Sequence, residues 1–127
     1  MEYYDVIASG YDELYSQEQL KKYNLINEYL DMEENETLLD VGCGIGLSSG
    51  PFNCRIIGID PAKEMLRRTR MKATERTDYI QARAEYLPFK DTAFDAVICV
   101  TAVHNFQEPK KGIKEMKRVG KGKGAIT

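Results

Sequence analysis

Leu-Leu-Asp-Val-Gly-Cys-Gly-Ile-Gly occupies residues 38–46 and decides the fold. Its apolar start predicts a short strand, and three glycines at alternate positions follow directly. Glycine is needed where the backbone must adopt a positive φ or approach a ligand closely. A strand that runs into such a turn, with a helix start after it, directs backbone N–H groups at a ligand in the crevice. The stretch therefore predicts an α/β fold with a ligand site at the turn.

Asp40 is the unusual residue of this stretch, because a carboxylate there would repel a nucleotide pyrophosphate and hold a cation. It favours a ligand with an amino or sulfonium group. The dinucleotide fingerprint G-x-G-x-x-G is incomplete, since its third glycine would fall on Leu47 or Ser49. The Walker motif G-x-x-x-x-G-K-[ST] does not occur. A nicotinamide-dependent oxidoreductase is therefore disfavoured.

Asp60 is a second acidic residue at the end of an apolar stretch, residues 55–60, and it lies twenty positions after Asp40. At about that spacing, a carboxylate in folds of this kind accepts hydrogen bonds from ribose hydroxyls. Asp60 could instead cap a helix that begins at Pro61, since proline is favoured in a first turn. The two roles are compatible.

The pattern Asp40-x-Gly42-x-Gly44 resembles the first motif of class I S-adenosylmethionine-dependent methyltransferases. Three more stretches match in order: residues 55–60, residues 84–89 (AEYLPF), which resemble the segment that meets adenine, and residues 94–100 (FDAVICV), which resemble the fourth strand. The resemblance implies a Rossmann-like parallel sheet with helices on both faces and S-adenosyl-L-methionine as cofactor. The cofactor-binding residues that it implies are Tyr11, Asp40, Gly42, Cys43, Gly44, Gly46, Asp60, Pro61, Ala84, Glu85, Tyr86 and Val100.

The N-terminal stretch YDVIASGYD, residues 4–12, resembles the opening of small-molecule methyltransferases of the ubiquinone/menaquinone-biosynthesis type. The resemblance implies a lid in which Tyr11 lies over the methionine end of the cofactor. A tyrosine face could stabilise the sulfonium by about 0.5–2 kcal/mol through a cation–π contact. Alternatively, Tyr4, Ile7 and Tyr11 lie at helical spacing and could simply pack on the domain.

His104 is the only histidine and the candidate catalytic residue, because the family places acceptor-facing residues after the fourth strand. It could act as a general base if the acceptor must lose a proton. It could equally be a surface residue of the loop. Holding an acceptor in line with the methyl group supplies most of the acceleration in either case.

The acceptor is unidentified, and charge leaves several partners open. The loop after the fourth strand reads TAVH and lacks the N-P-P-Y type used on base amines. Residues 1–60 hold 12 acidic and 3 basic residues, a net charge of −9, and residues 61–127 hold 8 and 15, a net charge of +7. The densest basic cluster lies in residues 110–123. Its first interpretation is a solvated helix face, and its second is a surface that binds RNA, an acidic partner or a second copy of the chain.

Composition is typical of one globular domain, with 43% hydrophobic and 30% charged residues among 127. No apolar run is long enough for a membrane span, and three cysteines without C-x-x-C spacing indicate neither disulfides nor zinc, so a cytoplasmic protein is expected. We expect a helical lid and cap over residues 1–36 and an α/β core over residues 37–127. The predicted helices are 17–30, 62–74 and 108–119, and the predicted strands are 37–41, 55–60, 78–82 and 94–100.

Three apolar faces are expected to pack on the sheet: Leu20, Tyr23, Ile26 and Leu30; Ala62, Met65, Leu66, Thr69 and Ala73; and Ile113 and Met116.

The C-terminus resembles the family only up to the start of a fifth strand at Gly124. The family's following helix and antiparallel strands are missing from the sequence, whether the chain is trimmed, naturally short or completed by a partner. An open edge strand is a pairing liability, so a homodimer is expected. A cofactor-binding module that does not catalyse transfer and supports another subunit is the alternative to an active enzyme.

Overall fold

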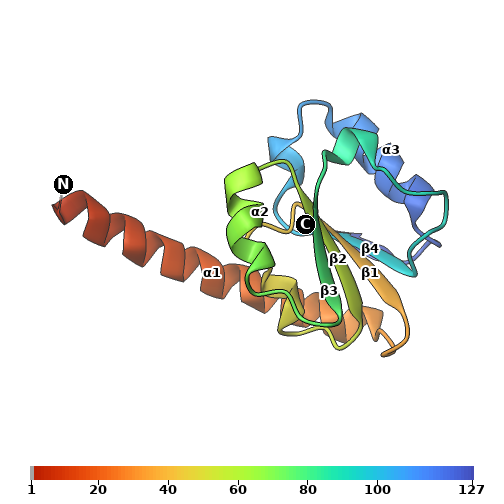
Figure 1. Ribbon diagram of the computed structural model, residues 1–127, viewed down its shortest axis with the longest axis horizontal. Coiled ribbons are helices and arrows are strands. Elements are labelled where there is room, and N and C mark those ends of the chain that lie inside the picture. Colours follow the sequence, from red (N-terminus) through yellow and green to blue (C-terminus); the bar gives the residue numbers. More distant parts are fainter. Residues whose placement is uncertain (1) are drawn as a thin grey trace.

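The chain forms a five-stranded parallel sheet with helices on both faces, as the computed structural model shows (Figure 1). The structure describes the backbone of residues 2–127 and the side chains of residues 14–127. The strands are β1 (Thr37–Val41), β2 (Arg55–Asp60), β3 (Thr77–Gln81), β4 (Ala96–Cys99) and β5 (Gly124–Ile126). Their order is β3-β2-β1-β4-β5, and each neighbouring pair is parallel. The predicted α/β class is confirmed.

Three α-helices and three short 3₁₀ helices connect the strands. They are α1 (Glu2–Leu30), η1 (Leu47–Ser49), α2 (Lys63–Arg70), η2 (Ala84–Tyr86), η3 (Val103–Asn105) and α3 (Pro109–Val119). The helix predicted over residues 17–30 begins much earlier, at Glu2, and the one predicted over residues 62–74 stops at Arg70. Thr74 and Thr77 contribute to that early end, because the Thr77 hydroxyl accepts the Thr74 N–H at 2.7 Å and competes with helical bonding.

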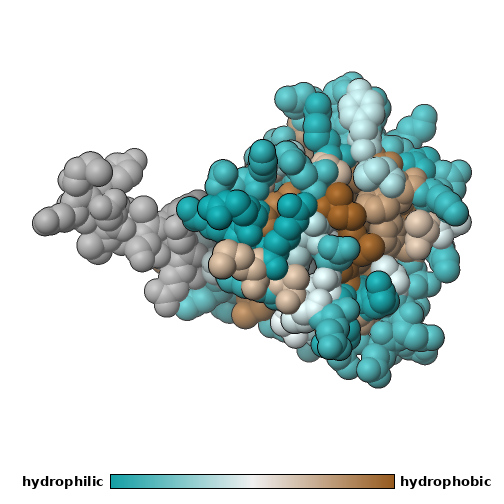
Figure 2. Space-filling view, viewed as in Figure 1, coloured by the Kyte–Doolittle hydropathy of each residue, from teal (hydrophilic) through white to brown (hydrophobic). Residues whose placement is uncertain are grey.

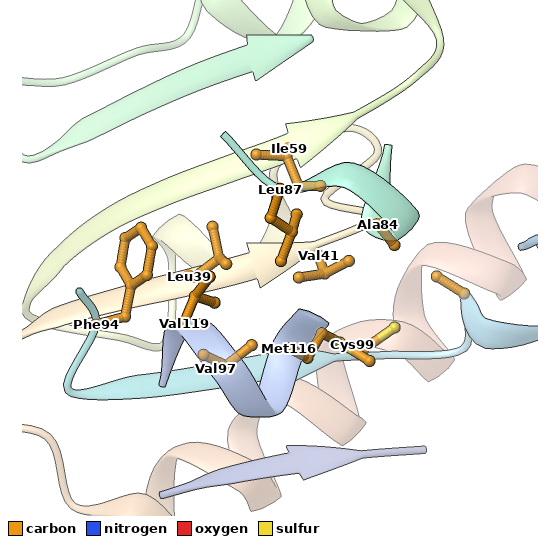
Figure 3. Packing of buried hydrophobic residues seen from close by; sticks show 11 residues of the cluster. Leu39, Val41, Ile59, Ala84, Leu87, Phe94, Val97, Cys99, Met116 and Val119 are labelled. Carbon is orange, nitrogen blue, oxygen red and sulfur yellow. The ribbon is translucent and has the colours of Figure 1, made fainter. Parts of the chain in front are cut away.

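One face of the sheet packs against α3 and the loops beside it. Alternate strand residues point to this side, and Figure 3 shows Leu39, Val97 and Cys99 directed towards Met116 and Val119 of α3. Met116 is buried as predicted, and Ile113 is only partly buried against the same cluster. This layer encloses the larger apolar core and fixes the loop that follows β4.

The other face packs against α1, η1 and α2. Tyr23, Ile26 and Leu30 of α1 are buried as predicted, but Leu20 is 38% exposed and the expectation for it is wrong. Gln19, only 5% exposed, takes the inward position beside it. At this end of the packed segment, the inward-facing position of α1 is therefore one residue before the predicted one. Here α1 borders a cavity and not the apolar core.

The face predicted for α2 is only partly correct. Leu66 and Thr69 are buried, whereas Ala62, Met65 and Ala73 are exposed. The helix is too short to bury five positions, and Ala73 lies beyond its end. Its outer side carries Lys63, Arg67 and Arg70, and Figure 2 shows a hydrophilic surface over it.

The fifth strand begins at Gly124 as predicted and pairs with β4 along one side. Among residues 2–127, no strand covers its other side. Ile126 at its end is 49% exposed. In the part of the chain that the structure describes, no helix is both long and apolar enough to cross a membrane.

Candidate active site

A cavity of about 880 Å³ lies where the carboxyl ends of the strands meet α1. The strand order brings together the turn after β1, the end of β2, the start of η2 and the end of β4, which are far apart in the sequence. Eight of the predicted cofactor residues line this cavity: Gly42, Cys43, Gly44, Asp60, Pro61, Ala84, Glu85 and Val100. Ligands bind at this end of open parallel sheets, so the cavity is the candidate site.

Four of the predicted site residues that the structure describes are not among those that line the cavity. Asp40, Gly46, Tyr86 and His104 lie outside its lining, and the side chain of Tyr11 lies outside the residues that the structure describes. The lid role of Tyr11 stays a prediction.

The glycine turn adopts the conformation that its sequence requires. Gly42, Gly44 and Gly46 have φ values of 77°, 53° and 80°, which side chains rarely adopt. A Cβ on Gly42 would lie 2.5 Å from the Ala102 Cβ, whereas one on Gly44 would meet only the Met65 sulfur at 3.6 Å. The turn is thus packed closely against the loop after β4 at Gly42 and less closely at Gly44.

The first three N–H groups of the turn do not point at a ligand as expected. Those of Gly42 and Cys43 donate to the Ile59 carbonyl at 2.8 and 2.9 Å, and that of Gly44 donates to Asp60 Oδ2 at 3.1 Å. The end of β2 takes these donors because β1 and β2 are neighbours. The turn therefore offers a ligand a close backbone approach, and its hydrogen bonds fix its shape.

Asp60 joins the glycine turn to the beginning of α2. Its Oδ1 accepts the Ala62 N–H at 2.9 Å while its Oδ2 accepts the Gly44 N–H. The helix begins at Lys63 and not at Pro61, so Asp60 precedes the cap position, which is Ala62. An ionised carboxylate has about four acceptor sites, so Asp60 keeps acceptor capacity towards the cavity that it lines.

Asp40 is fully buried behind the turn. The Ser48 hydroxyl donates to it at 2.8 Å and the Tyr23 hydroxyl donates at 3.3 and 3.4 Å to its two oxygens. Burial raises the pKa of Asp40 to about 6, although both hydroxyls lower it and the Asp60 charge raises it slightly. Asp40 itself does not line the cavity, so a cation there would be attracted by the electric field of its carboxylate. Tyr23, which is bound to Asp40, lines the cavity and would contact the cation directly.

Glu85 in η2 is a buried acidic residue of the cavity lining. Its Oε2 accepts the Glu108 N–H at 3.0 Å and lies 3.8 Å from an Arg83 nitrogen. Burial alone would raise the pKa of Glu85, but the N–H groups of residues 85, 107 and 108 and the Arg83 charge together lower it. Glu85 thus holds the chain at the beginning of α3 and lines the cavity, whereas its neighbour Tyr86 is 58% exposed and carries the Lys111 ammonium 3.4 Å from its ring centre.

The end of β4 contributes another part of the cavity lining. Thr101 has a φ of 57°, and the Lys22 ammonium of α1 donates to its hydroxyl at 2.7 Å. Val100 and Thr101 line the cavity. His104 follows in η3, is exposed and is not among the residues that line the cavity, so its predicted role as a base stays a prediction.

Sequence analysis predicted a lid from the N-terminal helix but missed the four described residues of α1 that line the cavity. Tyr15, Ser16, Gln19 and Tyr23 line it from one helix face. Their i, i+4 spacing is the signal that could have found them, but Tyr23 was assigned to the core and the polar positions beside it were passed over.

The family follows from a direct comparison. A model of the methyltransferase domain matches residues 39–127. The chain belongs to the methyltransferase family. The predicted resemblance to class I small-molecule methyltransferases is confirmed by this match and by relatives with such names. Demethylmenaquinone methyltransferase of Clavibacter sepedonicus is 35% identical over 97 residues, which are 72% of this chain and 40% of the relative.

Solved structures agree with the family match and with the fold. YcgJ of Bacillus subtilis is 30% identical with a TM-score of 0.74, over 83% of this methyltransferase-family chain and 47% of YcgJ. A protein in complex with the Trm112 methyltransferase activator of Haloferax volcanii has a TM-score of 0.80 at 23% identity, over 94% of this chain and 55% of that one, which shows a shared fold. The chain spans about half the length of the relatives that it matches.

Proposed function

We propose that this domain binds S-adenosylmethionine in the cavity and transfers its methyl group to a small-molecule acceptor. One observation carries the proposal: the cavity joins the glycine turn, Asp60 and the Ala84–Glu85 segment from three different loops. In this arrangement adenine lies by Ala84 and Glu85, the ribose hydroxyls donate to Asp60, and the methionine end extends over β1 and β4.

The chemistry asks the domain mainly to orient two reactants. The sulfonium is a good leaving group, so the residues around the cavity need to hold the acceptor in line behind the methyl carbon and exclude competing geometries. The buried Asp40 carboxylate supplies negative potential behind the turn, which favours a cationic ligand over an anionic one. His104 would act as a base only for an acceptor that must lose a proton.

Binding titrations test the cofactor. S-adenosylmethionine and S-adenosylhomocysteine should bind with one site each, whereas NAD should not bind. Tight NAD binding without binding of either sulfur compound would overturn the proposal.

A demethylated quinone is the first acceptor to test, because a relative is named demethylmenaquinone methyltransferase. Labelled methyl groups from the cofactor should appear in a quinone or another small molecule. RNA is tested beside them as the alternative acceptor. Cofactor binding with no transfer to any acceptor would favour the second candidate, a module that binds cofactor without catalysing transfer. His104 is exposed and does not line the cavity, which favours that candidate.

A further inference from the structure

The outward face of α3 carries a row of free lysines. Lys110, Lys114 and Lys117 follow one another at spacings of four and three residues, which places them on one helix face. All three are exposed, and none of them takes part in an ion pair within the described chain. We call these three residues the lysine row.

Charge compensation within α3 does not account for the lysine row. Glu115 is the only acidic residue of the helix, and Arg118 already binds it at 2.6 Å. The first turn holds no acidic residue, although acidic residues there stabilise a helix and lysines do not. Like charges at these spacings also repel one another. In α2, by contrast, Arg67 pairs with Glu64. The uncompensated charge of the lysine row therefore indicates an anionic partner.

An exposed aromatic ring lies between the lysine row and the cavity. Tyr86 in η2 is 58% exposed, and the Lys111 ammonium of α3 lies 3.4 Å from its ring centre. The Arg83 guanidinium carbon lies 5.7 Å from the same ring centre, and Arg83 also lines the cavity. Positive charge thus extends from the cavity past Tyr86 to the lysine row.

The chemistry of this surface favours single-stranded nucleic acid over other polyanions. Such a strand presents phosphates in a line and bases that stack on exposed aromatic rings, and proteins bind it with basic residues beside aromatic ones. An anionic membrane fits less well, because the apolar residues of α3, Ile113, Met116 and Val119, pack towards the sheet and none is left to enter a bilayer.

We propose that the lysine row binds the phosphates of a single-stranded nucleic acid and that Tyr86 stacks on one of its bases. This inference goes beyond the proposed function and does not depend on cofactor binding. Phosphate contacts and stacking do not distinguish RNA from DNA, so strands of both kinds should bind.

Fluorescence anisotropy with a labelled oligouridylate tests the lysine row. The triple variant Lys110→Gln, Lys114→Gln, Lys117→Gln should bind at least about tenfold more weakly at low salt. Each phosphate contact to a single strand contributes about 0.7 to the slope of log affinity against log salt, so the slope should become shallower by about 2.

A second triple variant is the matched control. Lys21→Gln, Lys63→Gln, Lys72→Gln removes the same charge from exposed lysines outside α3 and should bind like the wild type. Both triple variants should unfold at nearly the wild-type Tm, because glutamine and lysine have similar helix propensities.

Tyr86→Leu tests the aromatic ring. It should weaken oligouridylate binding by about fivefold or more, as expected when one stacked base is lost. Binding of polyphosphate, which has phosphates and no bases, should change less. Equal losses for the two polyanions would overturn the stacking role of Tyr86.

Three outcomes would overturn the proposal as a whole. One is a wild-type protein that does not bind oligouridylate at about 0.15 M salt, and another is equal weakening in the two triple variants. The third is that the lysine row serves another surface: it would be assigned to a membrane if only phosphatidylglycerol vesicles bind, or to a second copy if its loss only dissociates a dimer.

Discussion

The two ends of the cavity are built in different ways. At one end the turn after β1, Asp60 and α2 are joined by hydrogen bonds between residues of one β-α segment, 2 to 25 positions apart. At the other end α1, the end of β4 and the C-terminal residue meet from distant parts of the chain, through Lys22, Thr101 and Thr127. The first end is therefore fixed by local sequence and the second by tertiary packing.

Breaking the glycine turn should have the largest effect. Gly44→Val would place a β-branched residue at a φ of 53°, on the surface where a ligand approaches. We expect loss of measurable S-adenosylmethionine binding while most of the fold persists, because a Cβ there meets only the Met65 sulfur at 3.6 Å. Calorimetry measures the binding of S-adenosylmethionine, and circular dichroism measures whether the fold persists.

Gly50→Ala is the control for that substitution, since Gly50 has a φ of −76° and a Cβ there would lie 3.7 Å from the nearest atom, the Leu47 carbonyl oxygen. It should bind normally. Normal binding by Gly44→Val would place the ligand elsewhere.

Acidity should affect stability through Asp40. Because the folded pKa is about 6 and the ordinary value is 3.8, the folded state binds this proton more tightly than the unfolded state does. This contribution to stability is therefore complete below about pH 4 and is lost as the pH rises through 6. It amounts to about 3 kcal/mol, at 1.36 kcal/mol for each pKa unit.

Carboxyl groups with a lowered pKa, such as Glu85 and Asp95, change stability with pH in the opposite direction. They do so equally in the wild type and in Asp40→Asn, so the difference between the two proteins isolates the effect of Asp40. The free energy of unfolding of the wild type relative to Asp40→Asn should fall between pH 4 and pH 7 in urea titrations. A difference that does not depend on pH would show that Asp40 is ionised at its ordinary pKa.

Asp60 tests the local end of the cavity. Asp60→Ala should weaken S-adenosylmethionine binding by about 2–3 kcal/mol, because a carboxylate that holds two hydroxyls makes charge-assisted bonds. Asp60→Asn keeps an acceptor for the Gly44 or Ala62 N–H and should lose less. If folded Asp60→Ala binds as the wild type does, the residue only joins the turn to α2.

Tyr23 connects the two ends, since its α1 hydroxyl reaches the strand that carries the turn. Tyr23→Phe removes one donor to a buried carboxylate and should lower the free energy of unfolding at pH 7 by about 1–2 kcal/mol. The loss should shrink below pH 6 as Asp40 takes up a proton. Tyr29→Phe is the control, because Tyr29 is 80% exposed on the same helix, and equal losses in both variants would contradict the role of Tyr23.

Sequence reasoning predicts positions best where the motif is local. Gly42, Gly44 and Asp60 line the same cavity because spacing along two adjacent strands determines where their ends meet. The burial of Asp40 could not be found in this way, because Ser48 and Tyr23 enclose it from η1 and α1. The prediction that Leu20 and not Gln19 faces inward is wrong for a related reason. Both residues fit a helical period, and only the position of the cavity decides which one faces inward.

Association of two copies should have the smallest effect and tests the distant end. The open side of β5 offers unpaired backbone groups, and the halves of the chain carry net charges of −9 and +7. Both features favour contact between copies, so we propose a homodimer that weakens when salt screens the charges. Light scattering at micromolar concentration should report a dimer at low salt and more monomer at moderate salt.

Ile126→Lys should shift the population towards the monomer, because Ile126 is 49% exposed at the end of β5 and lysine protects an edge strand. Met71→Lys is the control, since Met71 is exposed on the far side of the sheet, after α2. A wild-type monomer at both salt concentrations would refute the dimer. The domain would then keep its β5 edge open in solution, and cofactor binding without turnover would become the stronger of the two proposed functions.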